Sequence, residues 1–193
     1  RDALDEAGLG EVFKLVTGAG ATGQAVIEAS DQICFTGSVA TGRKVGEACA
    51  RRFIPASLEL GGKDPALVLS DANIAHAARA LAWGSFVNGG QSCMSIERVY
   101  VEATVADAFI AALVKEASAL ELAWPDPKQG QIGPVIAASQ VELVRGQLAD
   151  AKAKGARALT GGELIEHGGV WCPPTVLVDV TDEMAVVADE SFA

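Results

Sequence analysis

Cysteine and histidine are scarce in this 193-residue sequence and lie far apart. The cysteines are Cys34, Cys49, Cys93 and Cys172, and the histidines are His76 and His167. No two cysteines form a Cys-x-x-Cys pair, and no Cys/His cluster has the spacing of a zinc site. We therefore expect no metal. Four scattered thiols in a chain of this size do not suggest a disulfide scaffold either.

Basic residues are also few. The chain has 15 Lys and Arg against 25 Asp and Glu, a formal net charge of -10, and Arg51-Arg52 is a locally basic pair. Binding to nucleic acid or to an anionic membrane requires clustered cations. We expect no nucleic-acid partner and no membrane partner.

No apolar run approaches the roughly 20 residues that a membrane-spanning helix needs. The N-terminus lacks the layout of a signal peptide, so a cytoplasmic location is expected. Half of the residues are hydrophobic and 21% are charged, which indicates a folded domain with a buried core rather than a disordered chain.

Strand-like apolar runs alternate with segments of helical periodicity, which predicts an α/β fold. Up to residue 60 the pattern suggests a parallel βαβαβ piece, with strands over residues 12–16, 33–35 and 54–60. The same alternation continues over residues 64–193. There Asp71 is expected to cap one helix, and Thr104 with Asp107 is expected to form a capping box for the next.

A glycine-rich turn at residues 18–23 matches Gly-x-Gly-x-x-Gly, the pattern of a dinucleotide pyrophosphate site. That fingerprint also requires an acidic residue at the end of the next strand, to bind the ribose. The next strand ends in Thr36-Gly37-Ser38, without a carboxylate. We therefore prefer to interpret residues 18–23 as a tight turn that leads into a helix.

Ser38 is a better candidate for contact with a phosphate. It is expected to cap a helix whose first turns contain no acidic residue, and free N–H groups at a positive helix end favour an anion. An ordinary serine cap explains the same pattern, so both readings stay open.

Residues 86–98 contain the strongest candidate nucleophile, Cys93. The paired glycines Gly89 and Gly90 break an apolar helix shortly before it and remove side-chain bulk beside the thiol. Most free cysteines are small buried hydrophobes, and we expect this of the other three. Cys93 differs because it stands in a polar bend. A Cys–His protease is an alternative, but no histidine lies nearby in sequence and no third orienting group is identifiable.

Glu59 is the candidate general base. It follows an apolar run and precedes Leu60, so partial burial is expected, which would suit a carboxyl that accepts a proton near neutrality. A solvent-facing charge at the end of a strand is the competing interpretation.

Two motifs make the chain recognisable. The segments Leu58-Glu59-Leu60-Gly61-Gly62-Lys63-Asp64-Pro65 and Asn88-Gly89-Gly90-Gln91-Ser92-Cys93 closely resemble the two signatures of the aldehyde dehydrogenase superfamily. Their separation (93 − 59 = 34 residues) also matches that family. The resemblance implies an incomplete aldehyde dehydrogenase fold: a Rossmann-like parallel βαβ segment, then an α/β catalytic domain. It places the end of the NAD(P)-binding domain in residues 1–62 and a truncated catalytic domain in residues 63–193.

The resemblance also implies roles. Cys93 would attack an aldehyde to form a thiohemiacetal and then a thioester, and Glu59 would activate the water that hydrolyses it. The cofactor would be NAD or NADP, and the full-length protein would be a homo-oligomer, a dimer or tetramer. The residues implied to bind the cofactor are Gly37, Ser38, Leu60, Gly61, Glu190 and Phe192.

Departures from the family pattern matter too. The chain corresponds to less than half of a usual member, and the asparagine of the oxyanion hole lies upstream of it; Asn88 belongs to the Cys93 motif instead. We expect the isolated 193-residue piece to be close to inactive, because one oxyanion donor is worth about 10²–10³ in rate. The alternative to a catalytic role is a truncated, non-catalytic remnant that acts as a structural or interaction module.

Overall fold

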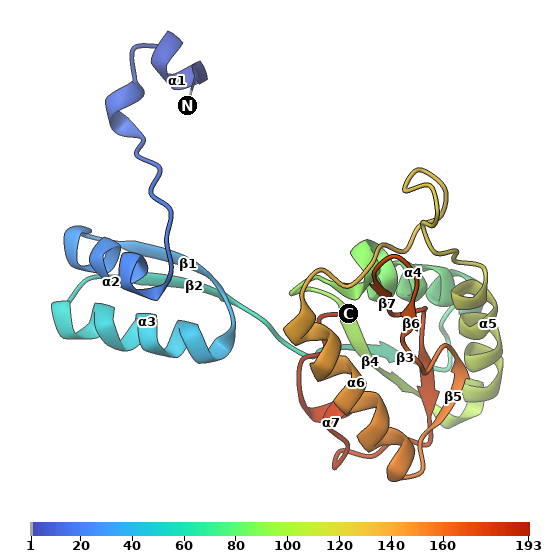
Figure 1. Ribbon diagram of the computed structural model, residues 1–193. Coiled ribbons are helices and arrows are strands. Elements are labelled where there is room, and N and C mark those ends of the chain that lie inside the picture. Colours follow the sequence, from blue (N-terminus) through green and yellow to red (C-terminus); the bar gives the residue numbers. More distant parts are fainter. Residues whose placement is uncertain (1) are drawn as a thin grey trace. The chain divides into compact units, whose positions relative to one another are not determined.

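The computed structural model describes residues 2–193, which form two compact units (Figure 1). The first unit ends at Leu60 and the second is Gly61–Ala193.

The first unit is a parallel βαβ arrangement. Its elements are α1 (Asp2–Glu6), the 3-10 helix η1 (Gly10–Val12), α2 (Gly20–Ala29), β1 (Ile33–Gly37), α3 (Val39–Arg52) and β2 (Ala56–Leu60). β1 and β2 pair in parallel from Ile33 opposite Ala56 to Gly37 opposite Leu60. α3 is the crossover between them (Figure 1). The predicted Rossmann-like βαβ segment is confirmed.

α3 forms where capping and periodicity agree. The Ser38 Oγ accepts a hydrogen bond from the Thr41 N–H at 3.3 Å, as the sequence predicts for an N-cap. Gly42, Val45 and Cys49 are spaced to lie on one face and are buried. That face packs in a small core with residues of α2 and β1.

The strand predicted over residues 12–16 is wrong. Only Val12 belongs to a regular element, η1, and the following residues are irregular and exposed, with Leu15 at 75% and Val16 at 59%. A strand requires a pairing partner, and within residues 2–60 β1 pairs with β2 alone. The glycine-rich turn at residues 18–23 consequently lacks a preceding strand as well as the acidic residue.

The second unit is a mixed α/β assembly. Its helical elements are α4 (Ile74–Phe86), η2 (Val87–Gly90), η3 (Ala103–Val105), α5 (Ala106–Ser118), α6 (Ala138–Ala153) and α7 (Ala185–Ala188). Its strands are β3 (Asp64–Val68), β4 (Ile96–Val101), β5 (Arg157–Thr160), β6 (Ile165–Glu166), β7 (Val170–Trp171) and β8 (Val176–Val178). β3 and β4 pair in parallel, while β5–β8 and the β6–β7 hairpin are antiparallel.

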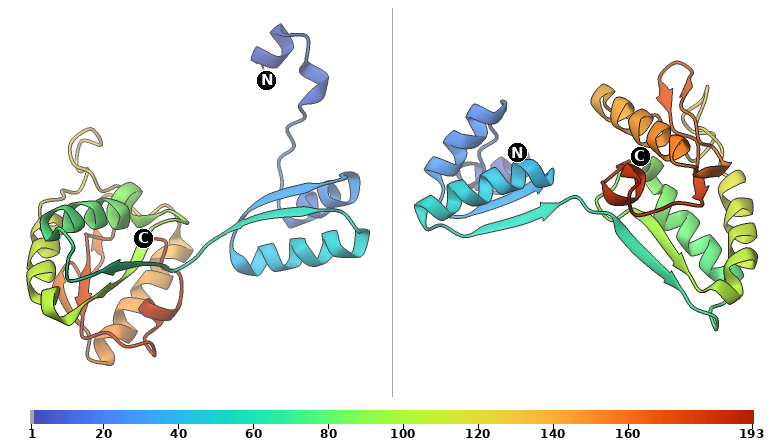
Figure 2. Two further views of the ribbon diagram at one scale, coloured as in Figure 1. Left: turned by 180° about the vertical axis from the view of Figure 1, so that it is seen from behind. Right: turned by 90° about the horizontal axis from the view of Figure 1, so that it is seen from below.

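The main core of this unit lies between the β3–β4 pair and the helices α4 and α5 (Figure 2). Val68, Ala78, Leu81, Phe109 and Leu113 are buried there. The core fixes the position of β4 and hence of the loop that leads into it from α4.

Two predicted helix caps are wrong. α4 begins at Ile74 with Asn73 as its N-cap, and the Asn73 side chain accepts a hydrogen bond from the His76 N–H at 3.0 Å. Asp71 lies in the preceding turn and is exposed. α5 is entered through η3 and has no side-chain cap, so Thr104 and Asp107 form no capping box.

No helix within residues 2–193 combines the length and apolar character needed to cross a bilayer.

The Asn73 cap can be tested against the residue that the sequence suggested. Replacing a capping asparagine by alanine costs about 1 kcal/mol, so Asn73→Ala should speed hydrogen exchange in the first turn of α4 by about fivefold. Asp71→Ala is the matched control and should leave that exchange unchanged. A larger effect of Asp71→Ala in hydrogen–deuterium exchange would show that the cap is assigned to the wrong residue.

Candidate active site

Cys93 lies in a turn between η2 and β4, and its side chain is exposed. Short backbone hydrogen bonds shape the turn: Ser92 N–H donates to the Gly90 carbonyl at 2.8 Å, and Ser95 N–H donates to the Ser92 carbonyl at 3.1 Å. The Ser95 side chain is buried and donates to the carbonyl of Ser85 in α4 at 2.9 Å. The thiol therefore stands on a tight turn that is tied to α4.

Three successive left-handed residues produce this turn: Asn88 (φ 57°), Gly89 (φ 63°) and Gly90 (φ 73°). Glycine adopts this conformation without strain. A Cβ on Gly90 would also lie 2.5 Å from the backbone carbon of Ala193. The space left by Gly90 is thus filled by Ala193, whereas the sequence had suggested space beside the sulfur.

Gln91 connects the Cys93 loop by hydrogen bonds to the segment at residues 134–136. Its side-chain oxygen accepts a hydrogen bond from the Ile136 N–H at 2.9 Å, and its amide donates to the carbonyls of Pro134, at 3.2 Å, and Asn88, at 3.3 Å. The Asn88 amide donates to the Gln91 carbonyl at 2.9 Å. Sequence reasoning did not single out Gln91, whose only signal was its place in the motif.

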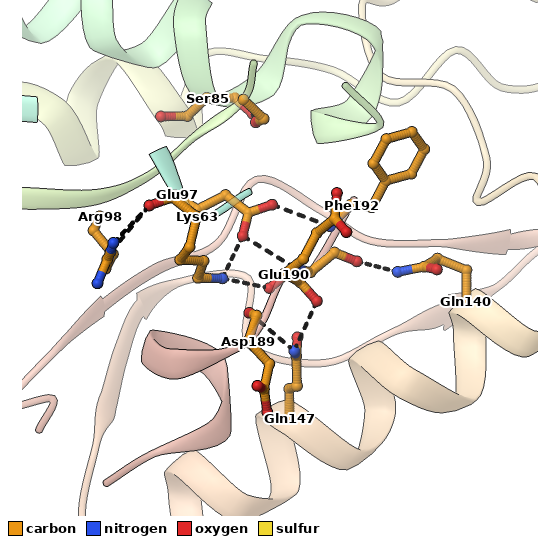
Figure 3. Close-up of polar contacts among 11 residues, drawn as sticks. Lys63, Ser85, Glu97, Arg98, Gln140, Gln147, Asp189, Glu190 and Phe192 are labelled. Carbon is orange, nitrogen blue, oxygen red and sulfur yellow. Dashed lines mark hydrogen bonds and ion pairs between the residues drawn. The ribbon is translucent and has the colours of Figure 1, made fainter. Parts of the chain in front are cut away.

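Glu190 and Phe192 lie in the same unit as Cys93, in an irregular segment at the C-terminal end of the chain (Figure 3). The Glu190 carboxylate rests on the backbone of Gly61, since a Cβ there would lie 2.0 Å from Oε1. Any other side chain at position 61 would displace the Glu190 carboxylate from this place. Gly61 and Glu190, both predicted to bind the cofactor, are therefore in direct contact.

A buried ion pair between Lys63 and Glu97 holds this segment in place (Figure 3). The two side chains are only 7% and 8% exposed. The Glu97 oxygens accept hydrogen bonds from the N–H groups of Ser191, at 3.0 Å, and Phe192, at 3.1 Å. Lys63 Nζ also donates to the Ser191 hydroxyl at 2.8 Å. Sequence reasoning missed this pair because it connects residues that are remote in the chain.

The surroundings of Glu190 disfavour its charged form. Burial raises the pKa of Glu190 above its ordinary value, and the negative charge of Glu97 raises it further. A hydrogen bond from the Gly62 backbone and the positive charge of Lys63 act in the opposite direction. Glu190 thus lies near a second carboxylate, Glu97, which itself pairs with Lys63.

In the first unit, Gly37, Ser38 and Leu60 gather at one end of the strand pair. The parallel register sets Gly37 opposite Leu60, and Ser38 starts α3 at the same edge. Leu60 packs against α3 at Gly42, where a Cβ would lie 2.4 Å from the leucine Cδ2. The first turn of α3 contains no acidic residue. This edge, at the carboxyl ends of parallel strands and a helix N-terminus, has the chemistry to bind a phosphate.

The partial burial predicted for Glu59 is wrong. Glu59 lies opposite Thr36 near the end of β2, and its side chain is exposed. Leu58 and Leu60 face α3, whereas Glu59 points to the opposite face of the strand and is exposed. Glu59 belongs to the first unit and Cys93 to the second.

A cavity of about 570 Å³ lies within the second unit, lined by β4, β8, α5 and α6. It reaches Lys63, Glu97 and Ser191, but neither Cys93 nor Glu190 lines it. We therefore do not assign it to a substrate. Within residues 2–193, no group of three or more His, Cys, Asp or Glu residues is arranged to hold a metal ion.

Comparison with known proteins agrees with the motifs. The model of the aldehyde dehydrogenase family matches residues 2–193. Vanillin dehydrogenase of Pseudomonas fluorescens is 41% identical over 98% of this chain and 40% of its own length. Lactaldehyde dehydrogenase of Escherichia coli, a solved structure, superimposes with a TM-score of 0.93 at 36% identity, over 99% of this chain and 41% of that one.

A NAD⁺ complex of the aldehyde dehydrogenase from Bacillus cereus superimposes with a TM-score of 0.85 at 34% identity, over 92% of this chain and 37% of that one. The chain thus spans about 40% of the length of the curated relatives that it matches. Both the predicted fold class and the resemblance are confirmed, and the chain belongs to the aldehyde dehydrogenase family.

Proposed function

We propose that the protein carrying this chain oxidises an aldehyde to a carboxylic acid, with NAD or NADP as the hydride acceptor and Cys93 as the nucleophile. The observation that carries the proposal is the exposed Cys93 thiol, on a glycine-built turn whose Gly90 contacts Ala193 beside Glu190 and Phe192. Membership of the aldehyde dehydrogenase family supports the reaction class.

Cys93 forms a bond from sulfur to the carbonyl carbon of the aldehyde, and the carbonyl electron pair moves to oxygen, giving a thiohemiacetal. NAD or NADP, when bound, would supply the hydride acceptor, and the electron pair on oxygen re-forms the carbonyl as the hydride leaves this carbon. The carbon remains attached to Cys93 as a thioester. Glu59 takes a proton from water as its oxygen attacks the thioester. The C–S bond then breaks, the proton taken by Glu59 returns to the sulfur, and the carboxylic acid is released.

The residues present fit a nicotinamide dinucleotide. Gly37 and Ser38 would receive the pyrophosphate, since the N-terminus of α3 favours an anion and no acidic side chain opposes it. The Glu190 carboxylate would accept hydrogen bonds from ribose hydroxyls. Leu60, Gly61 and Phe192 would adjoin the nicotinamide. A NAD⁺ complex in a structural relative is consistent with this assignment.

We further propose that residues 1–62 belong to the cofactor-binding domain and residues 63–193 to the catalytic domain. The substrate is an aldehyde, and the whole protein is a homo-oligomer located in the cytoplasm.

The role of Cys93 can be separated from that of an ordinary exposed thiol. In the protein that carries this chain, Cys93→Ala should lower aldehyde-dependent formation of reduced cofactor by on the order of 10³ or more, because the covalent route is lost. The burial expected of Cys34 is wrong, since its thiol is also exposed. Cys34→Ala is therefore the control and should retain activity. Full activity of Cys93→Ala in this absorbance assay would overturn the proposal.

The role of Glu59 predicts a different defect. Glu59→Gln should slow thioester hydrolysis by about 10²–10⁴ while leaving acylation of Cys93 intact. Mass spectrometry after mixing with aldehyde and cofactor should then find the protein heavier by one acyl group. Glu47→Gln, which alters an exposed carboxylate of α3, should turn over normally and accumulate no adduct. Normal turnover by Glu59→Gln would exclude Glu59 as the base.

A further inference from the structure

The segment from Asp189 to Phe192 has no regular secondary structure, and side chains from elsewhere bind its backbone (Figure 3). The Gln147 amide donates to the carbonyls of Asp189, at 3.3 Å, and Glu190, at 3.1 Å. The Gln140 amide donates to the carbonyl of Ser191. Side chains of α6 thus provide the hydrogen-bond donors that a regular helix or strand would provide to these carbonyls.

Glu97 binds the donors of the same segment. Its Oε2 accepts from the N–H of Ser191 and its Oε1 from the N–H of Phe192. The two carboxylate oxygens therefore bind two successive backbone N–H groups. The ammonium of Lys63 balances the negative charge. A carboxylate in this arrangement specifies the local backbone more tightly than a single acceptor can.

The conformation held in this way is strained. Phe192 has a φ of 53°, in the left-handed region that a bulky residue rarely occupies and that costs about 1–3 kcal/mol. Strain of this size persists only where the surroundings determine the backbone, and such residues cluster at ligand sites. Glu97 binds the N–H of this strained residue.

Stability alone does not account for the ion pair. Replacing a buried pair by apolar side chains of similar volume is often neutral or stabilising. An apolar pair would fill the same space, but it would leave the Ser191 and Phe192 N–H groups without acceptors. The ion pair is thus needed to provide acceptors for these backbone N–H groups and not to fill buried space.

We propose that Glu97, neutralised by Lys63, is a positioning element for cofactor binding: it fixes the backbone that presents Glu190 and Phe192 beside Gly61. This inference rests on the proposed function and assigns to that site residues which do not themselves contact the cofactor. Lys63 follows Gly61-Gly62, and Glu97 lies in the strand that follows Cys93. One ion pair thereby connects the cofactor-binding segment to the strand that carries the nucleophile's loop.

The test uses Glu97→Gln in the protein that carries this chain. The amide keeps the size but offers one acceptor oxygen instead of two, so one backbone N–H loses its partner. We expect the Kd for NAD or NADP, measured by titration calorimetry without aldehyde, to rise about tenfold or more, as for loss of a hydrogen bond to a charged group. The KM for aldehyde should change less than twofold.

Asp179→Asn is the matched control. It removes the charge from an exposed ion pair with Arg157 in the same unit, where the two groups lie 2.5 Å apart. Its cofactor affinity should equal that of the parent. An unchanged Kd in Glu97→Gln would overturn the inference. A loss explained entirely by a smaller fraction of binding-competent protein in the same titration would also overturn it.

A milder variant keeps the inference testable if Glu97→Gln does not fold. Gln140→Ala removes the donor to the Ser191 carbonyl from the surface of α6 and should weaken cofactor binding by several-fold. Gln129→Ala, in an exposed loop, should not. Parent protein that oxidises aldehyde through Cys93 while both Gln140→Ala and Glu97→Gln bind cofactor normally would refute the positioning role and leave the proposed function intact.

Discussion

The buried ion pair between Lys63 and Glu97 is the interaction on which the site in the second unit depends. Both charges are almost completely removed from solvent, a costly arrangement unless each is paired and hydrogen-bonded. Here the carboxylate binds two backbone N–H groups, and the ammonium binds a hydroxyl as well as the carboxylate. The polar groups of an irregular segment are satisfied as a result, and that segment carries Glu190.

Glycine supplies the second constraint. Gly61 allows the Glu190 carboxylate to lie against the backbone, and Gly90 allows the approach of Ala193 to the nucleophile's loop. In the first unit, Gly42 accepts the side chain of Leu60. At each position another part of the chain occupies the space of the missing Cβ, so these glycines allow segments that are separated in sequence to pack closely.

Features set by neighbouring residues could be predicted from the sequence. Examples are the Ser38 cap and the parallel βαβ crossover, which follow from local hydrogen bonding and periodicity. The strand expected over residues 12–16 was wrong because strand formation depends on a partner. The Lys63–Glu97 contact was not foreseen, because the two residues lie 34 positions apart and no local pattern signals it. The burial expected of Glu59 failed for a similar reason, since burial depends on what packs over a strand.

The most direct test of this account is a crystal structure of the protein that carries this chain, with NAD or NADP bound. We expect the Glu190 carboxylate to accept hydrogen bonds from the hydroxyls of the nicotinamide ribose. The Ser191 and Phe192 N–H groups should remain bound to Glu97, and the Cys93 sulfur should face the nicotinamide. A cofactor bound with its nicotinamide ribose away from Glu190, or with Cys93 directed away from the ring, would contradict it.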